Sequence, residues 1–144
     1  MVAVGRVTSY GVDPAARAVA APVSELLATS LARVPRLLVV SQGRMLELIQ
    51  VGASGPDTSA GGFVNAARRA GATDVVEGTV YALAGGRLRL DLRRVDLATG
   101  AIDDVQTVEG SDLIALVDSG TAHLVAALGA ELRAKSLRAT HRRQ

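Results

Sequence analysis

Cysteine and tryptophan are absent from this sequence, and aromatic residues make up only 2% of it. A chain without cysteine forms no disulfide and has no thiolate to act as a nucleophile or a metal ligand. With so few aromatic residues, a core has to be built from Val, Leu, Ile and Ala. No apolar run approaches the roughly 20 residues that cross a bilayer, so we expect no membrane insertion of this segment. We expect a soluble domain, either cytoplasmic or extracytoplasmic behind an upstream membrane anchor.

The residue patterns of common enzyme sites are missing as well. Gly85-Gly86-Arg87 lacks the Lys-Ser/Thr pair of a phosphate-binding loop, and no Gly-x-Ser-x-Gly stretch provides a serine nucleophile. His141 lies in a basic tail, and His123 has no evident catalytic partner in its predicted helix. The adjacent acids Asp103 and Asp104 would point to opposite faces of a strand, which disfavours a metal site. We therefore expect a chain that is not an enzyme and that binds no cofactor or metal.

Positive charge is concentrated at the end of the chain. Residues 133–144 contain five basic residues and no acidic residue, whereas the formal net charge of the whole chain is +2. Residues 1–132 therefore carry a net charge of −3. We predict one α/β domain in residues 1–132 and a basic C-terminal tail or linker in residues 133–144. Because the tail contains no stacking aromatic residues, nucleic acid is not an expected partner.

Apolar spacing and turn residues predict the elements of the first half of the chain. A strand, a helix, a strand and two short helices are predicted at residues 2–7, 14–34, 37–40, 44–50 and 63–70. Asp13 and Pro14 are typical of a helix start. Either the helix proper begins later, with Pro22 at its first position, or an earlier turn is kinked at Pro22. The unbroken apolar run at residues 37–40 predicts a parallel strand that is buried on both faces.

From residue 73 onward, apolar residues recur at every second position. Residues 73–83, 87–97 and 101–109 are predicted to form an antiparallel meander with Gly-containing turns. Ser111 and Asp112 then open a last helix with a long apolar face. The predicted order is β-α-β-α-α-β-β-β-α, which is an α/β single domain with a mixed β-sheet and a C-terminal antiparallel meander packed by helices.

Glu77 is the one acidic residue within the otherwise neutral stretch 75–80. A two-residue hairpin loop would place Glu77 opposite Arg94, and a three-residue loop would place it opposite Arg93. Either register gives Glu77 an arginine, so we interpret this carboxylate as structural. The two-residue register would also explain why Arg94 shares a strand face with leucines.

Residues 51–61 contain the densest cluster of Gly, Ser, Pro and Asp in the sequence and are predicted to form a mobile loop. Open α/β sheets bind ligands at the ends of their strands, where Ser41 would lie near this loop. We therefore select four residues as a candidate partner or ligand surface: Ser41, Ser54, Asp57 and Thr58. No catalytic, cofactor-binding or metal-binding residue is predicted.

Six segments of the chain follow one another in a characteristic order and spacing. They are VAV at 2–4, GVDP at 11–14, VSELLATSLARVPRLLVVS at 23–41, AARRAGATDVVEGTV at 66–80, GGRLRLDLRRVDLATGAI at 85–102 and SDLIALVD at 111–118. Together they resemble the TolB-like N-terminal domain family over about residues 2–130. Two short segments depart from that family: Gly5-Arg6-Val7 replaces a usual Leu-Pro-Phe, and Ala21-Pro22 replaces a frequent Asp-Gly.

Members of that family stand beside kinases, adenylate cyclases and tetratricopeptide repeats in bacterial signalling proteins. The resemblance therefore implies a non-catalytic regulatory or protein-interaction sensor module of a larger bacterial signalling protein. Two alternatives are a periplasmic domain that assembles an envelope complex and a domain that binds a small ligand. The expected partners are another protein or the neighbouring domains of the parent chain, and a homo-oligomer is a further alternative.

Overall fold

The computed structural model describes residues 1–11, 13–49, 51–52, 55–56 and 59–143. Its elements are β1 (Val2–Ser9), α1 (Pro14–Ala32), α2 (Gln42–Leu48), β2 (Val51–Gly52), β3 (Gly55–Pro56), α3 (Ala60–Arg69), β4 (Asp74–Ala82), the 3-10 turn η1 (Ala84–Gly86), β5 (Leu88–Asp96), β6 (Ile102–Gly110) and α4 (Leu113–Arg143). The mixed sheet and the helices packed on it confirm the predicted α/β single domain.

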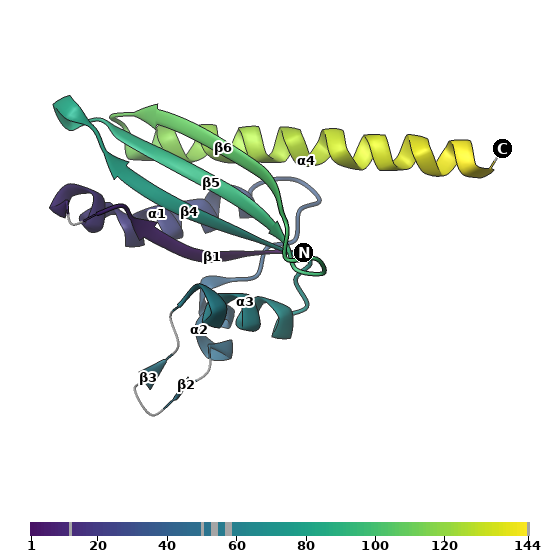
Figure 1. Cartoon of the computed structure of the whole chain (residues 1–144), viewed down its shortest axis with the longest axis horizontal. Coiled ribbons are helices and arrows are strands. Elements are labelled where there is room, and N and C mark those ends of the chain that lie inside the picture. Colours follow the sequence, from purple (N-terminus) through teal and green to yellow (C-terminus); the bar gives the residue numbers. More distant parts are fainter. Residues whose placement is uncertain (12, 50, 53–54, 57–58, 144) are drawn as a thin grey trace.

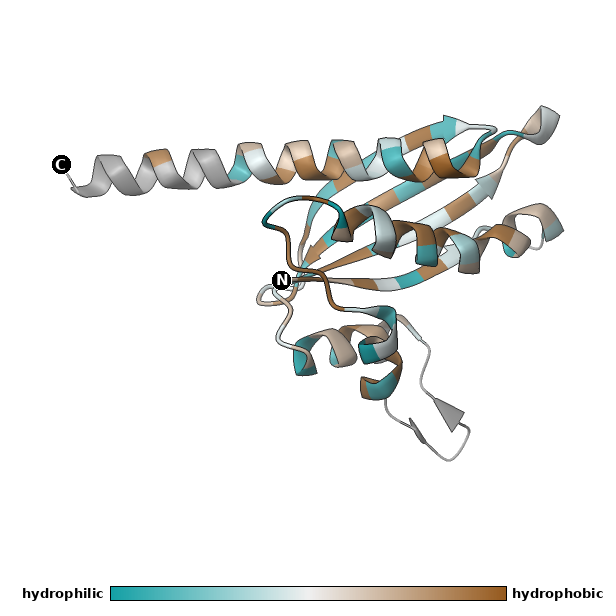
Figure 2. Ribbon diagram, turned by 180° about the vertical axis from the view of Figure 1, so that it is seen from behind, coloured by the Kyte–Doolittle hydropathy of each residue, from teal (hydrophilic) through white to brown (hydrophobic). Residues whose placement is uncertain are grey.

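The four long strands form one mixed sheet in the order β1-β4-β5-β6 (Figure 1). β1 is parallel to β4, whereas β4, β5 and β6 form the predicted antiparallel meander. α1 and α4 cover one face of this sheet, and α2 and α3 lie below the start of β1 on the other side (Figures 1 and 2). The second face is therefore covered only near the start of β1 and β4, and we call its uncovered part the open face.

Two apolar cores follow from this arrangement, because each face of the sheet packs against different helices. The buried residues between the sheet and α1 and α4 are Val2, Val4, Ala16, Val23, Leu27, Leu31, Val76, Val80, Leu90, Leu92, Val108, Leu116, Val117 and Leu124. The buried residues around α2 and α3 are Ala3, Val40, Met45, Ile49, Ala66, Ala67, Val75 and Leu97. Neither core contains an aromatic side chain among these buried residues, as the composition predicts.

Pro22 lies inside α1, so a single helix begins at Pro14 and continues through this second proline. The Asp13 side chain caps the helix by accepting a hydrogen bond from the Ala15 N–H at 2.8 Å. Pro22 and Ala18 are both exposed, so water can bind the Ala18 carbonyl that loses its helical donor. The alternative in which the helix proper begins at Pro22 is therefore wrong, because α1 already begins at Pro14.

Residues 37–40 do not form the predicted strand, and this part of the prediction is wrong. They make a single parallel bridge to β1, in which the Val2 N–H donates to the Leu38 carbonyl at 2.8 Å and the Val40 N–H donates to the Val2 carbonyl at 2.9 Å. Leu38 is 65% exposed, so the run is not buried on both faces. The run is apolar because Val39 packs against the first core and Val40 belongs to the second.

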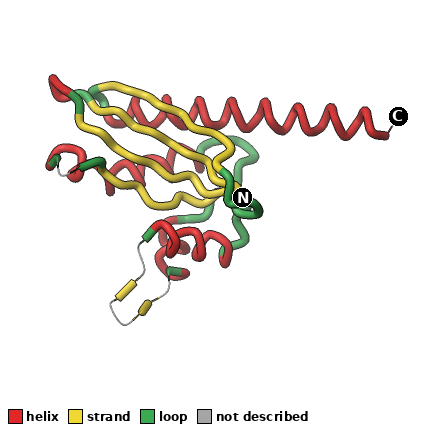
Figure 3. The backbone as a smooth tube through the Cα atoms, in the orientation of Figure 1, coloured by secondary structure: helices red, strands yellow, loops and turns green. Residues whose placement is uncertain are grey.

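α4 extends well past the end of the sheet (Figures 1 and 3). It continues without interruption across the predicted boundary at residue 132, and its first half packs against β5, β6 and α1. By length and composition alone, Leu113–Glu131 could cross a membrane, with a mean hydropathy of 1.6. Only 28% of this apolar stretch is buried, so much of it faces solvent in the isolated chain.

Gly120 brings α4 close to the sheet. A Cβ atom at this position would lie 2.8 Å from Leu92 Cδ1 and 3.5 Å from Val108 Cγ2. We expect Gly120→Val to lower the free energy of unfolding by about 1–3 kcal/mol, because the core has no room for the added atoms. Urea unfolding would measure this loss. As a control, Gly43→Ala adds a methyl group where no atom lies within 4 Å, and it should raise stability by about 0.5 kcal/mol. A tolerated Gly120→Val would contradict the close packing.

Candidate functional site

The predicted candidate surface is only partly within the described residues. Ser41 is the N-cap of α2, and its hydroxyl accepts a hydrogen bond from the Arg44 N–H at 3.1 Å. Ser54, Asp57 and Thr58 lie outside the described residues. The hydroxyl of Ser41 therefore has a local structural role, and the ligand surface proposed around it stays a prediction.

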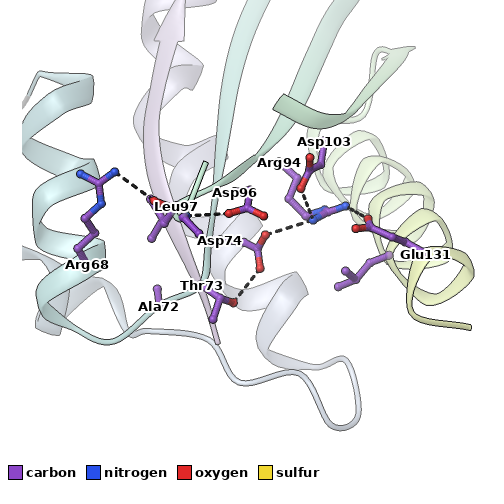
Figure 4. A pocket seen from close by; sticks show the side chains of 11 residues that line it. Arg68, Ala72, Thr73, Asp74, Arg94, Asp96, Leu97, Asp103 and Glu131 are labelled. Atoms are coloured by element: carbon purple, nitrogen blue, oxygen red, sulfur yellow. Dashed lines mark hydrogen bonds and ion pairs between the residues drawn. The ribbon is translucent and has the colours of Figure 1, made fainter. Parts of the chain in front are cut away.

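Arg94 is the centre of the densest group of charges in the described part of the chain. It projects from β5 on the face of the sheet that α1 and α4 cover, and its side chain is 5% exposed. Its guanidinium contacts Asp74 of β4 at 3.1 Å, Asp103 of β6 at 3.4 Å and Glu131 of α4. Figure 4 shows these three carboxylates converging on the guanidinium from three elements. Through Glu131, Arg94 therefore joins the middle of α4 to the sheet.

The electrostatics of the Arg94 cluster favour the charged guanidinium. Burial alone would lower the pKa of Arg94, but the hydrogen bonds and charges of Glu131 and Asp74 raise it above its ordinary value. A cavity of about 590 Å³ adjoins the cluster, and Arg68 lies on its far wall, where it donates to the Leu97 carbonyl at 3.2 Å. The described residues contain no group of three acids or histidines arranged to hold a metal ion. The cluster thus acts as an ion-pair clamp between the sheet and α4.

The hairpin has the three-residue register, in which Glu77 lies opposite Arg93. The Glu77 Oε2 and Arg93 Nε atoms are 4.0 Å apart, at the limit of an ion pair. The two-residue alternative, with Arg94 opposite Glu77, is wrong because the residues of η1 occupy the whole turn. Arg94 instead lies opposite Val76, and its unexpected place among leucines is explained by the three acids around it.

The open face carries a second set of linked polar side chains. Asp91 accepts hydrogen bonds from Arg89 at 3.0 Å and from Thr107 at 2.8 Å. Arg89 also lies over the Tyr81 ring at 5.0 Å, and Tyr81 is tilted against Tyr10 with ring centroids 5.0 Å apart. Burial would raise the pKa of Asp91, but the hydrogen bonds from Arg89 and Thr107 hold this pKa below its ordinary value. These contacts tie the three strands of the meander together.

A groove of about 710 Å³ lies beside the outer edge of β1. Its walls come from α1, α2 and α3, and its floor includes Arg6 and Val7 of β1. Gln42 joins two of the walls, because its side-chain amide donates to the Ser24 carbonyl at 3.3 Å and the Ser24 hydroxyl at 3.0 Å. The sequence pattern gave no indication of this groove, since the residues that line it come from four separate elements.

The chain matches no protein-family model, and no curated protein matches it in sequence. Its fold, however, is similar to several solved structures. The LpoB C-terminal domain from Escherichia coli is 20% identical with a TM-score of 0.59, covering 77% of this chain and 82% of that chain. Lipoprotein GNA1162 from Neisseria meningitidis is 16% identical with a TM-score of 0.51, covering 94% of this chain and 97% of that chain.

TolB from Acinetobacter baumannii is 15% identical with a TM-score of 0.54, covering 88% of this chain and 27% of that chain. This chain therefore spans about a quarter of TolB. This structural similarity agrees with the sequence resemblance to the TolB-like family, and the agreement concerns the fold alone. The chain has a TolB/LpoB-like fold, and the signalling context that the resemblance implied is not part of that finding.

Removal of the central charge of the Arg94 cluster should be costly. We expect Arg94→Leu to lower the free energy of unfolding by about 3–5 kcal/mol, because Asp74, Asp103 and Glu131 lose their common partner. Urea denaturation would measure the change. Arg44→Leu is the matched control, since it removes an exposed pair with Glu47 and should cost less than about 0.5 kcal/mol. Equal losses in the two variants would show that the cluster does not clamp α4.

The lowered pKa of Asp91 predicts a specific response to acid. A carboxylate with a depressed folded-state pKa stabilises the fold at neutral pH, and this stabilisation is lost as the pH falls below the ordinary value of 3.8 and through the folded-state pKa. Asp91→Asn should therefore be less stable than the wild type at neutral pH, and the difference should shrink in strong acid. Urea unfolding as a function of pH would test this. A difference that stays constant with pH would argue against the assigned ionisation.

Proposed function

We propose that this chain is a non-catalytic protein-interaction domain that helps to assemble a complex in a bacterial cell envelope. The observation that carries the proposal is the fold shared with a lipoprotein, which covers nearly the whole of both chains. The proposal corresponds to the envelope alternative predicted from the sequence. The signalling sensor, which the sequence favoured, has no comparable support among the structures named above.

The three described side chains whose pKa is shifted, Arg89, Asp91 and Arg94, support a structural use of charge in the sheet. A carboxylate that works as a general base near neutral pH needs a raised pKa, and a lysine needs a lowered one. The pKa of Asp91 is instead lowered, and the pKa values of Arg89 and Arg94 are raised. These three groups are held in ion pairs. Their charges are thus used to join strands and helices.

The sheet itself offers surfaces for protein recognition. β1 and β6 are the two outermost strands, and exposed sheet edges present backbone N–H and C=O groups that a partner strand can bind. Exposed apolar side chains lie along β6, where Ile102 is 56% and Val105 is 52% exposed. A domain that joins other proteins through its edges needs no reactive centre, which agrees with the ion-pair arrangement above.

Fractionation of the source bacterium would test the proposed function. With an antibody against the chain, the endogenous full-length protein should be found in the envelope fraction. After mild detergent extraction, size-exclusion chromatography should show it eluting well ahead of the monomer. A protein confined to the cytosolic fraction would refute the envelope role. An envelope protein that elutes only as a monomer would refute the assembly role.

A further inference from the structure

The two edges of the sheet differ in what borders them. The outer edge of β1 has backbone hydrogen bonds only at its start, where residues 38–40 form the bridge to Val2. Farther along, Arg6 and Val7 line the groove between α1, α2 and α3, so the second half of this edge opens into the groove. At the other side of the sheet, no described strand lies beyond β6. Part of each edge therefore has no strand partner among the described residues.

The β1 groove is basic. Arg6 of β1 and Arg17 of α1 are both exposed and both line it. Neither arginine has an ion-pair partner within the described residues. Glu25 is the acidic residue of the groove lining, so the lining has a net positive charge. The rest of the lining is formed by small or apolar side chains together with Ser24 and Gln42.

The β6 edge has the opposite charge. β6 contains Asp103, Asp104 and Glu109 and no basic residue. Asp103 is used by the Arg94 cluster, but Asp104 contacts only the amide of Gln106 among the described residues. β6 thus combines the features of a strand that would suit the β1 groove: an open edge, an acidic character and exposed apolar side chains.

The strand directions and the helix layers allow the two edges to meet. β6 is parallel to β1, because β1 is parallel to β4 and each of the next two strands reverses direction. A second copy placed beside the first could therefore continue the sheet with β6 parallel to the neighbouring β1. α4 packs on β6 and α1 packs on β1 on the same face of the sheet, so the two helices would become neighbours. This would cover part of the apolar surface that α4 leaves exposed.

We infer that copies of this chain associate edge to edge, with the acidic β6 of one copy added to the basic outer edge of β1 in the next. The inference rests on the proposed assembly function and names the partner as a second copy of the chain. The contact is heterologous, so it leaves a free β1 edge at one end and a free β6 edge at the other, and the association can continue. Pairing of like edges is disfavoured, since it would oppose acid to acid or arginine to arginine.

Crosslinking of the otherwise cysteine-free chain would test the arrangement directly. Thr8 pairs with Thr79 and Val105 pairs with Arg93, and the Arg93 side chain donates to the Thr79 hydroxyl, so Thr8 and Val105 lie on the same open face. Thr8→Cys and Val105→Cys should be prepared as separate full-chain proteins carrying different tags. When these two are mixed with a short bismaleimide, we expect a mixed dimer. Each variant alone should give at least about tenfold less product, because the proposed contact joins unlike edges.

Charge variants provide the control. Arg6→Glu combined with Arg17→Glu should weaken association about tenfold in sedimentation velocity and suppress the mixed crosslink, since two exposed positive charges of the groove become negative. Arg87→Glu reverses an exposed arginine in the hairpin turn, outside the groove. This variant should leave both the association and the mixed crosslink unchanged. Circular dichroism would verify that each variant is folded. Raised salt should weaken association of the unmodified chain.

Three results would overturn the inference: a chain that stays monomeric at high concentration, crosslinks within a single cysteine variant, or equal effects of the groove and turn charge reversals. None of them would by itself refute the envelope role, which the fractionation experiment tests separately. Conversely, edge-to-edge association of a purely cytosolic protein would refute the envelope role and leave the contact between copies intact.

Discussion

The buried guanidinium of Arg94 determines how the second half of this fold is held together. A charge with so little exposed surface is tolerated only when carboxylates surround it, and here they come from β4, β6 and α4. The strand order, the register of the hairpin and the position of α4 all have to be correct before the three acids meet. The apolar core beside it holds the helices on the sheet, but apolar contacts are less selective about alignment. The ion pairs thus add specificity to a layer that leucines and valines stabilise.

The coverage of the sheet is uneven, and this explains why charges lie where they do. The face under α1 and α4 is apolar apart from the region of Arg94, whereas the open face carries arginines, acids and the two tyrosines in mutual contact. Along each strand of the meander the side chains therefore alternate between the two environments. The same alternation places polar side chains on the open face, so one face of the sheet is apolar and covered by helices while the other is polar and largely uncovered.

The class of fold and most of its elements could be predicted, because their signals are local. The alternation in residues 73–109 and the cap at Asp13 each act within a few neighbouring residues, and the structure confirms both. Residues 37–40 were misjudged because an apolar run does not reveal whether it is buried in a strand or merely crosses between two cores. The Arg94 cluster was missed because its acids lie 20, 9 and 37 positions away, a separation that only tertiary structure closes. The groove beside β1 was missed for the same reason.

The parallel pairing of β1 with β4 also bears on the order in which the chain can fold. The Thr73 hydroxyl donates to the Met1 carbonyl, and these residues are 72 positions apart, while the meander joins strands that are close in sequence. Closure of so long a loop is entropically costly, so local hairpins form faster than distant parallel pairs. During synthesis, β1 leaves the ribosome before its partner exists and must wait until residue 82 has been made. For that interval an apolar strand is unpaired, and the nascent chain is then most exposed to misassociation.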